Sequence, residues 1–271
     1  MRTAIQFHNA VKRIHGAKVL CVESLKIYER ESAAFYGLSR DCVEVLVKQI
    51  TGTFLPDKGS VSVLGTNSRE IANEHVWFQL IQNIGIYNTL PLFQESSSIG
   101  ENIAILYRAR NGSLDEHKLS REVLRLSNLV QLTITDLAKM MSDATPSQRM
   151  KVRLSRAIAY RPKIVILCDP TANLPPSVAQ QLAGLVKRAK RKLGFTLVLF
   201  TSDLWILQRL ADRVFFLNPE DGFFIENQLR GWYHRLFPFM DPSPSQLLRL
   251  WRDALHYSGM HRTAEQEIEK Y

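Results

Sequence analysis

The sequence predicts an α/β fold with a mostly parallel core sheet, and three observations lead to this prediction. Apolar and basic residues alternate with helical spacing over residues 149–159, which indicates an amphipathic helix that ends before Pro162. Residues 164–167 are all apolar, as expected for a strand that is buried on both faces. Cys168 and Asp169 follow at the carboxyl end of this strand, the edge of an open α/β sheet where ligands bind.

The composition predicts one sizeable globular domain and limits its partners. The chain has 271 residues, of which 45% are hydrophobic, so a full core is expected. Its net charge of +9 suits nucleic acid, an anionic membrane surface or an acidic partner. The apolar runs are too short to cross a bilayer. The cysteines are scattered without metal-ligand spacing, so we expect a reduced cytosolic protein without a metal site.

The sequence of the N-terminal part of the chain indicates antiparallel β structure followed by a helix. Short apolar runs indicate strands at 4–7, 18–20, 24–28 and 32–36. A helix is expected at 45–51, where the segment closes on Gly52. The turn signal of residues 56–59 then precedes a half-buried strand at 60–65.

The sequence after residue 65 indicates further helices and buried strands. Helices are expected at 69–80, 103–110, 116–126 and 178–192, and strands at 83–87 and 195–201. The helix at 178–192 ends in a run of basic residues. Such a run fits either a solvated helix end that the helix dipole favours or a functional basic patch.

Several motifs resemble those of the ATP-binding subunits of ABC transporters. The resemblance covers residues 3 to about 226 and is carried by Gln49-Ile50-Thr51-Gly52, Arg156-Ala157, Arg161-Pro162 and Pro170-Thr171-Ala172. It implies an ABC-type P-loop NTPase fold, with an antiparallel β subdomain, a mostly parallel core sheet and a helical subdomain at about 90–150. Residues 1–227 then form the nucleotide-binding domain. Residues 228–271 match no motif, and their composition predicts a C-terminal aromatic and helical extension.

The phosphate-binding loop departs from the pattern of this family. A P-loop reads Gly-x-x-x-x-Gly-Lys-Ser/Thr, because glycine amides cradle the phosphates, the lysine balances their charge and the hydroxyl holds Mg²⁺. The corresponding residues here are Gly37, Leu38, Ser39, Arg40, Asp41, Cys42, Val43 and Glu44. Cys42, Val43 and Glu44 therefore replace the second glycine, the lysine and the hydroxyl residue. Asp41 and Glu44 each oppose triphosphate binding by on the order of 1–3 kcal/mol.

Other positions that handle nucleotide in this family are also replaced. The resemblance places Ile14 where the family stacks an aromatic residue on adenine, and Thr89 where a glutamine contacts Mg²⁺. Cys168 and Asp169 stand in place of an Asp-Glu pair that ends the Walker B strand. Ser202 stands in place of a histidine that senses the γ-phosphate.

The signature loop, which faces the partner's γ-phosphate in dimers of this family, is altered as well. In place of Leu-Ser-Gly-Gly-Gln the chain has Ala144, Thr145, Pro146, Ser147 and Gln148. Pro146 removes an amide donor, and Ser147 replaces a glycine that allows close approach.

These replacements predict a catalytically silent ABC-type subunit. We expect no working catalytic residue, no metal and no cofactor. The resemblance implies two partners: an integral membrane permease, contacted through Leu90, Leu92 and Phe93, and a second ABC ATPase subunit in a hetero- or homodimer. The chain is then cytoplasmic and peripheral on the inner face of the membrane, and nucleic acid is not expected as a partner.

Two other functions stay open. The chain is an ATPase subunit for a lipid or another solute if Arg40 and Asp169 still support weak ATP hydrolysis with Mg²⁺. Alternatively, it is a soluble ABC-fold protein that binds nucleic acid or ribosomes, although such proteins carry tandem domains or a long inserted coiled coil. The transported substrate cannot be read from this subunit.

Overall fold

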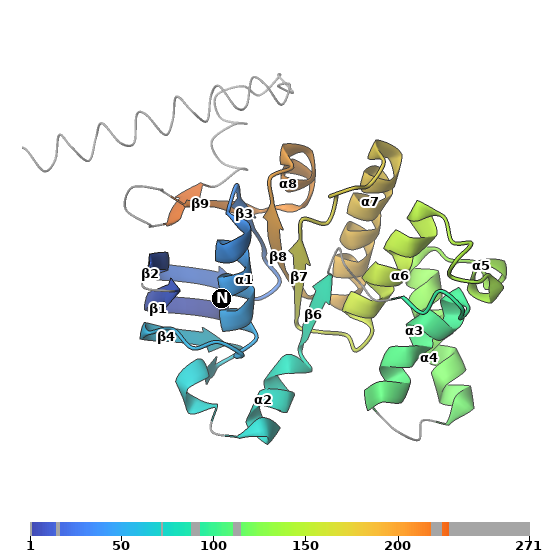
Figure 1. Cartoon of the computed structure of the whole chain (residues 1–271), viewed down its shortest axis with the longest axis horizontal. Helices are drawn as coiled ribbons and strands as arrows, with labels where there is room; N and C mark the ends of the chain where they lie inside the picture. Colours follow the sequence, from blue (N-terminus) through green and yellow to red (C-terminus); the bar gives the residue numbers. More distant parts are fainter. Residues whose placement is uncertain are drawn as a thin grey trace, which may run out of the picture. The chain divides into compact units, whose positions relative to one another are not determined.

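The computed structural model describes residues 2–14, 17–71, 73–87, 93–110, 115–217 and 224–227 (Figure 1). The described residues belong to one unit, Met1–Leu229. The expected C-terminal extension at 228–271 lies outside the described residues, as do Thr89, Leu90 and Leu92. The aromatic and helical extension predicted from the composition of residues 228–271 therefore stays a prediction.

A four-stranded antiparallel sheet with the order β2-β1-β4-β5 is formed by the N-terminal part of the chain. Its strands are β1 (Thr3–Ile14), β2 (Ala17–Tyr28), β4 (Lys58–Val63) and β5 (Thr66–Asn67). Phe7 pairs with Leu25 of β2 and with Val61 of β4, and all three side chains are buried. The two strands predicted at 18–20 and 24–28 are a single strand, because β2 pairs with β1 along almost its whole length.

A second sheet has six strands in the order β10-β9-β3-β8-β7-β6. They are β3 (Ser32–Tyr36), β6 (Ile84–Tyr87), β7 (Ile164–Cys168), β8 (Thr196–Thr201), β9 (Arg213–Leu217) and β10 (Phe224–Asn227). Neighbouring strands are parallel except β10, which is antiparallel to β9. The α/β fold with one antiparallel and one mostly parallel sheet is thereby confirmed.

The prediction that residues 32–36 belong to the antiparallel sheet was wrong. This segment is β3, which pairs in parallel with both β8 and β9. Ala33, Ala34 and Phe35 are completely buried. A strand that is buried on both faces is typical of the interior of a parallel sheet, and grouping this segment with the preceding strands missed this.

The helices surround these sheets as Figure 1 shows, with α3, α4 and α5 grouped beside α6. They are α1 (Arg40–Ile50), α2 (Glu74–Ile81), α3 (Ile99–Arg110), α4 (Glu116–Val130), α5 (Ile134–Ala138), α6 (Pro146–Ile158), α7 (Pro176–Leu193) and α8 (Leu204–Leu210), with a 3-10 turn, η1 (Ser68–Glu70). One hydrophobic cluster joins α1 to both sheets. Within that cluster the Phe35 ring stacks on Phe200 and on Phe215, with centroids 5.0 and 5.1 Å away.

Capping residues explain where the observed helices differ from the predicted ones. Helix α1 begins at Arg40 rather than at residue 45, because Ser39 caps it: Ser39 Oγ accepts the N–H of Cys42. Helix α3 begins at Ile99 rather than at residue 103, behind a cap formed by Ser98 and Glu101. The helix predicted at 69–80 divides into η1 and α2, and Asn73 caps the second piece.

Gln49 of α1 is fully buried, and its side-chain amide has no hydrogen-bond partner in the described part of the chain. An unpaired buried polar group costs about 1–3 kcal/mol. We therefore expect Gln49→Leu to raise the free energy of unfolding in urea by about 1 kcal/mol or more. Gln180→Leu, at an exposed position of α7, serves as the control and should change it by less than about 0.5 kcal/mol. A lower stability of Gln49→Leu would show that the amide has a partner.

Candidate functional site

The loop that follows β3 contains only Gly37, Leu38 and Ser39 before α1 begins. Gly37 has a φ of +69°, and its N–H donates to Thr201 O at 3.2 Å. The N–H of Cys42 donates to Ser39 Oγ at 3.3 Å, and the N–H of Val43 to Ser39 O at 3.0 Å. Phosphate-binding loops offer free backbone N–H groups to the anion. Here the amides of two of the expected loop residues are already bonded inside the first turn of the helix.

After Arg40 and Asp41, the side chains at the start of α1 are apolar or acidic. Cys42 is buried, and burial raises the pKa of its thiol to about 11. Val43 is partly buried and packs against the hydrophobic cluster. Glu44 is exposed and pairs with Lys48 at 2.6 Å, and the hydrogen bond from Lys48 lowers the pKa of Glu44. This turn of the helix therefore carries a carboxylate rather than a free ammonium group.

The carboxyl ends of β7 and β8 lie beside this loop. Asp169 follows β7 with a φ of +40°, and its N–H donates to Phe200 O at 2.8 Å. Partial desolvation raises the pKa of the exposed Asp169 carboxyl, and a backbone hydrogen bond from Ser202 opposes that shift. Because β3, β8 and β7 are neighbours, Gly37, Ser202 and Asp169 lie at adjacent strand ends.

Residues beyond these strand ends are held by hydrogen bonds within the chain. Thr171 Oγ1 donates to Asp203 Oδ2 at 2.8 Å. The other oxygen of Asp203 caps α8 by accepting the N–H of Trp205 at 2.9 Å. The loop after β7 and the start of α8 are thus tied together. The side chain of Ile14 and all of Thr89 lie outside the described residues, so their expected places at the site stay predictions.

The signature segment forms the capped start of α6. Thr145 and Gln148 form a capping box, in which the N–H of Thr145 donates to Gln148 Oε1 at 2.9 Å. Gln148 Nε2 donates to Asp136 Oδ1 at 2.6 Å, and Ser147 Oγ donates to Gln181 Oε1 at 2.7 Å. These bonds link the segment to α5 and α7, and none links it to the strand ends within the described ranges. Pro146 sits in the first turn, where a proline loses no helical hydrogen bond.

Phe93 packs against α6 instead of standing free. Its ring is half-buried, and the guanidinium carbons of Arg149, Arg153 and Arg156 lie 5.7, 5.6 and 5.1 Å from the ring centroid. Arg149 also binds Glu95 through two hydrogen bonds of 2.8 and 2.7 Å. Of the three residues expected to contact a permease, only Phe93 is described, and its contacts are within the chain.

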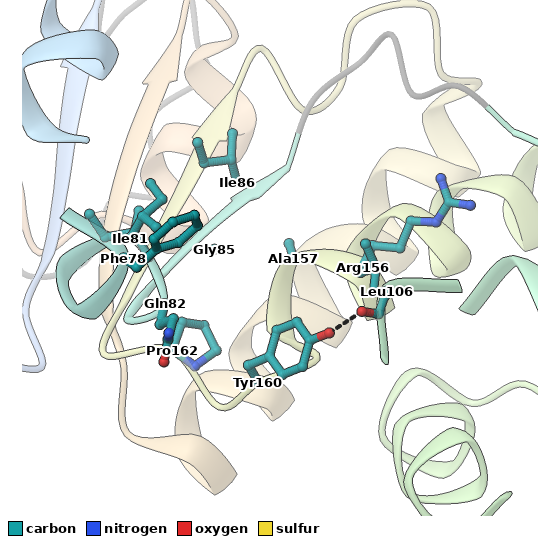
Figure 2. A pocket seen from close by; sticks show the side chains of 11 residues that line it. Phe78, Ile81, Gln82, Gly85, Ile86, Leu106, Arg156, Ala157, Tyr160 and Pro162 are labelled. Atoms are coloured by element: carbon teal, nitrogen blue, oxygen red, sulfur yellow. Dashed lines mark hydrogen bonds between the residues drawn. The ribbon is translucent and has the colours of Figure 1, made fainter. Parts of the chain in front are cut away.

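An apolar groove of about 400 Å³ opens between α2, β6, α3 and the end of α6 (Figure 2). Its lining residues are Phe78, Ile81, Gln82, Ile84, Gly85, Ile86, Leu106, Arg156, Ala157, Tyr160 and Pro162. Phe78 and Ile86 are 50% and 38% exposed. Tyr160 donates a hydrogen bond to the backbone oxygen of Leu106, which Figure 2 shows. Exposed aromatic and aliphatic side chains in a groove are typical of a docking surface.

One wall of the groove has a close contact at Gly85 of strand β6. A Cβ atom at this position would lie 1.8 Å from the backbone oxygen of Ala157 in α6. Sequence reasoning missed the groove, because its walls come from segments far apart in the chain. One signal was present: residues 76–81 are richer in apolar side chains than a helix with one buried face requires.

Comparisons with known proteins bear on this fold. No family model matches the chain. It is 29% identical over 229 residues to the methionine import ATP-binding protein MetN 3 of Oceanobacillus iheyensis, covering 82% of this chain and 65% of that protein. It is 26% identical over 203 residues to the energy-coupling factor transporter ATP-binding protein EcfA2 of Clostridium acetobutylicum, covering 73% and 68%. The chain thus spans less than two thirds of the methionine-import relative.

Solved structures agree on the architecture. The ATP-binding cassette MJ0796, solved as a dimer with ADP and Pi, matches with a TM-score of 0.70 and 20% identity over 84% of this chain and 100% of that one. The protein cbiO1 from Clostridium perfringens, part of the transporter complex cbiONQ, matches with a TM-score of 0.74 and 19% identity over 97% of this chain and 100% of that one. The chain has the fold of an ABC-type ATP-binding cassette.

No group of three or more His, Cys, Asp or Glu side chains in the described ranges could hold a metal ion. No helix among the described residues is long and apolar enough to cross a membrane.

Cys168 of the cassette is only partly exposed at the end of β7, and burial together with the nearby Asp169 raises its pKa to about 12. At pH 8 only about one such thiol in 10⁴ is ionised, against roughly a quarter for an ordinary cysteine. We expect maleimide to label Cys168 at least about 100-fold more slowly in the folded chain than in urea, as measured by mass spectrometry. Folded and unfolded rates within about tenfold of each other would indicate an open, ionised site.

Proposed function

We propose that this chain is a catalytically silent ABC-type subunit that docks on a membrane permease at its cytoplasmic face. The match to import ATP-binding proteins supports the transporter assignment. One observation supports the absence of ATP hydrolysis. Helix α1 begins at Arg40, directly after a loop of three residues, and Ser39 already binds the amides of Cys42 and Val43. A longer loop with free amides is what a triphosphate requires.

The chemistry of the same turn supports this proposal. Val43 packs against the core and has no charge to offer a phosphate. Glu44 pairs with Lys48, and its carboxylate replaces the hydroxyl that holds Mg²⁺ in a P-loop. Arg40 is exposed but stands next to Asp41 in the chain. These residues do not fit Mg-ATP, and we do not expect ATP or Mg²⁺ as cofactors of this chain.

The groove beside β6 supports the second half of the proposal, the docking of a permease. Its exposed Phe78 and Ile86 form an apolar surface, and its volume of about 400 Å³ accommodates a few side chains of a partner. We therefore place the permease contact in this groove, whose strand β6 precedes the predicted contacts Leu90 and Leu92 in the sequence. A second ABC ATPase subunit is proposed as the dimer partner.

The alternative is a subunit that still binds and hydrolyses ATP weakly. The relatives' names describe ATP-binding proteins, and the exposed carboxylate of Asp169 lies at a strand end where it could orient a water molecule. Calorimetric titration of the chain with Mg-ATP separates the two functions. Micromolar affinity would favour the active subunit, and no measurable binding favours the silent one.

A further inference from the structure

Five basic side chains gather at the amino ends of three neighbouring strands of the core sheet. They come from the turn before β3, from the segment before β7 and from the end of α7, which leads into β8. They are Arg30, Arg161, Lys163, Arg191 and Lys192, and all five are exposed. We call this set the amino-edge patch. It lies at the edge of the sheet opposite to the loop at Gly37.

Three contacts place Arg30, Lys163 and the end of α7 close together. The N–H of Arg30 donates to Thr196 Oγ1 at 2.9 Å, and the N–H of Thr196 donates to Lys163 O at 2.8 Å. A Cβ atom at Gly194, which follows the end of α7, would lie 3.7 Å from Arg30 Nε. Adjacent strands lie about 4.8 Å apart, so Arg30 and Lys163 flank β8 at roughly 10 Å from each other.

The positive charge of the patch is not neutralised within the described residues. None of its five cations takes part in an ion pair there. Two nearby carboxylates already have partners, since Glu31 binds Arg213 and Asp212 binds Lys190. Glu29 is exposed beside Arg30 and remains as a carboxylate near the patch. Five positive charges therefore face solvent against one unpaired negative charge.

The patch adjoins the apolar groove through one residue. Pro162 lines the groove, and its two neighbours in the chain, Arg161 and Lys163, belong to the patch. A permease segment that fills the groove would bring the surface beside it close to the bilayer. The inner leaflet carries anionic lipid, which attracts clustered lysine and arginine residues.

We propose that the amino-edge patch binds the anionic headgroups of the bilayer next to the docked permease. This inference rests on the proposed docking function. The position of the patch beside the groove favours a lipid surface over nucleic acid, because a permease docked there would hold the patch at the bilayer. Each basic residue near such a surface strengthens binding about fivefold, and salt screens the effect.

The test is sedimentation of the full chain with protein-free vesicles. We expect binding to vesicles of phosphatidylcholine with phosphatidylglycerol, weakened by added salt, and none to vesicles of phosphatidylcholine alone. The double variant Lys163→Glu/Lys192→Glu should bind the anionic vesicles at least about 25-fold more weakly. The control Lys118→Glu/Arg121→Glu changes the net charge equally at exposed, unpaired positions of α4 and should bind within about twofold of the original chain.

Three outcomes would overturn the proposal. The first is no binding to anionic vesicles. The second is an equal loss of vesicle binding in both double variants, which would show that net charge alone determines binding. The third is tighter binding of duplex nucleic acid than of vesicles at the same salt concentration. Because the vesicles hold no permease, failure here leaves the docking function intact. The variant Phe78→Asp, which changes the groove, should still bind the vesicles. Loss of vesicle binding in this variant would show that the groove rather than the patch holds the lipid.

Discussion

Titration of the purified chain with Mg-ATP is expected to give a Kd no tighter than about 1 mM, which corresponds to roughly −4 kcal/mol. Micromolar binding would need about 4 kcal/mol more. In a P-loop a charge-assisted hydrogen bond from the lysine contributes about 1.5–3 kcal/mol, and Val43 cannot make it. The exposed Glu44 carboxylate, which pairs with Lys48, supplies no hydroxyl for Mg²⁺ and adds negative charge beside the phosphates.

Acidification should not restore nucleotide binding. The hydrogen bond from Lys48 lowers the pKa of Glu44, so the carboxylate stays charged as the pH falls toward the ordinary glutamate value of about 4.3. A titration at pH 5 is therefore expected to resemble the one at neutral pH.

Val43→Lys alone is the informative variant, and we expect it not to rescue binding. The buried Cys42 side chain and the Glu44 carboxylate remain, and Ser39 still binds the amides of the first turn. Isothermal calorimetry with the original chain as reference measures the outcome. Micromolar affinity of the original chain would refute the silent function, and rescue by Val43→Lys alone would show that the first turn can open for phosphate.

Phe78→Asp is expected to release the chain from its membrane complex. Phe78 is half exposed in the apolar groove, and truncating such an anchor typically costs 2 kcal/mol or more, a factor of about 30 in affinity. The aspartate adds a charge that an apolar partner surface would have to desolvate. Co-purification of the tagged chain from detergent-solubilised membranes measures the loss.

Leu55→Asp is the matched control, because Leu55 is 45% exposed, similar to Phe78, and does not line the groove. It should leave co-purification unchanged, and circular dichroism should show both variants folded. Retention of Phe78→Asp in the complex would move the permease contact elsewhere. Failure of the original chain to co-purify with any membrane protein would end the transporter assignment.

Local sequence patterns predicted much of the architecture and of the strand-end site. The apolar run of β7 and the basic amphipathic pattern of α6 identified the core sheet and its neighbouring helix. The apolar runs before them placed Asp169 and Ser202 directly after buried strands, and the structure has them after β7 and β8. The sequence alone also showed that Cys42, Val43 and Glu44 stand where a P-loop has a glycine, a lysine and a hydroxyl residue.

Tertiary structure decided what depends on contacts between distant segments. The sequence could not place β3 in the parallel sheet, because its partners β8 and β9 lie more than 150 residues further along the chain. The groove is lined by segments far apart in the chain, and Gly85 lets its strand β6 approach the backbone of α6 closely. The amino-edge patch likewise joins residues near positions 30, 162 and 192, whose charges become neighbours only when the strands pair and bring their amino ends to one edge.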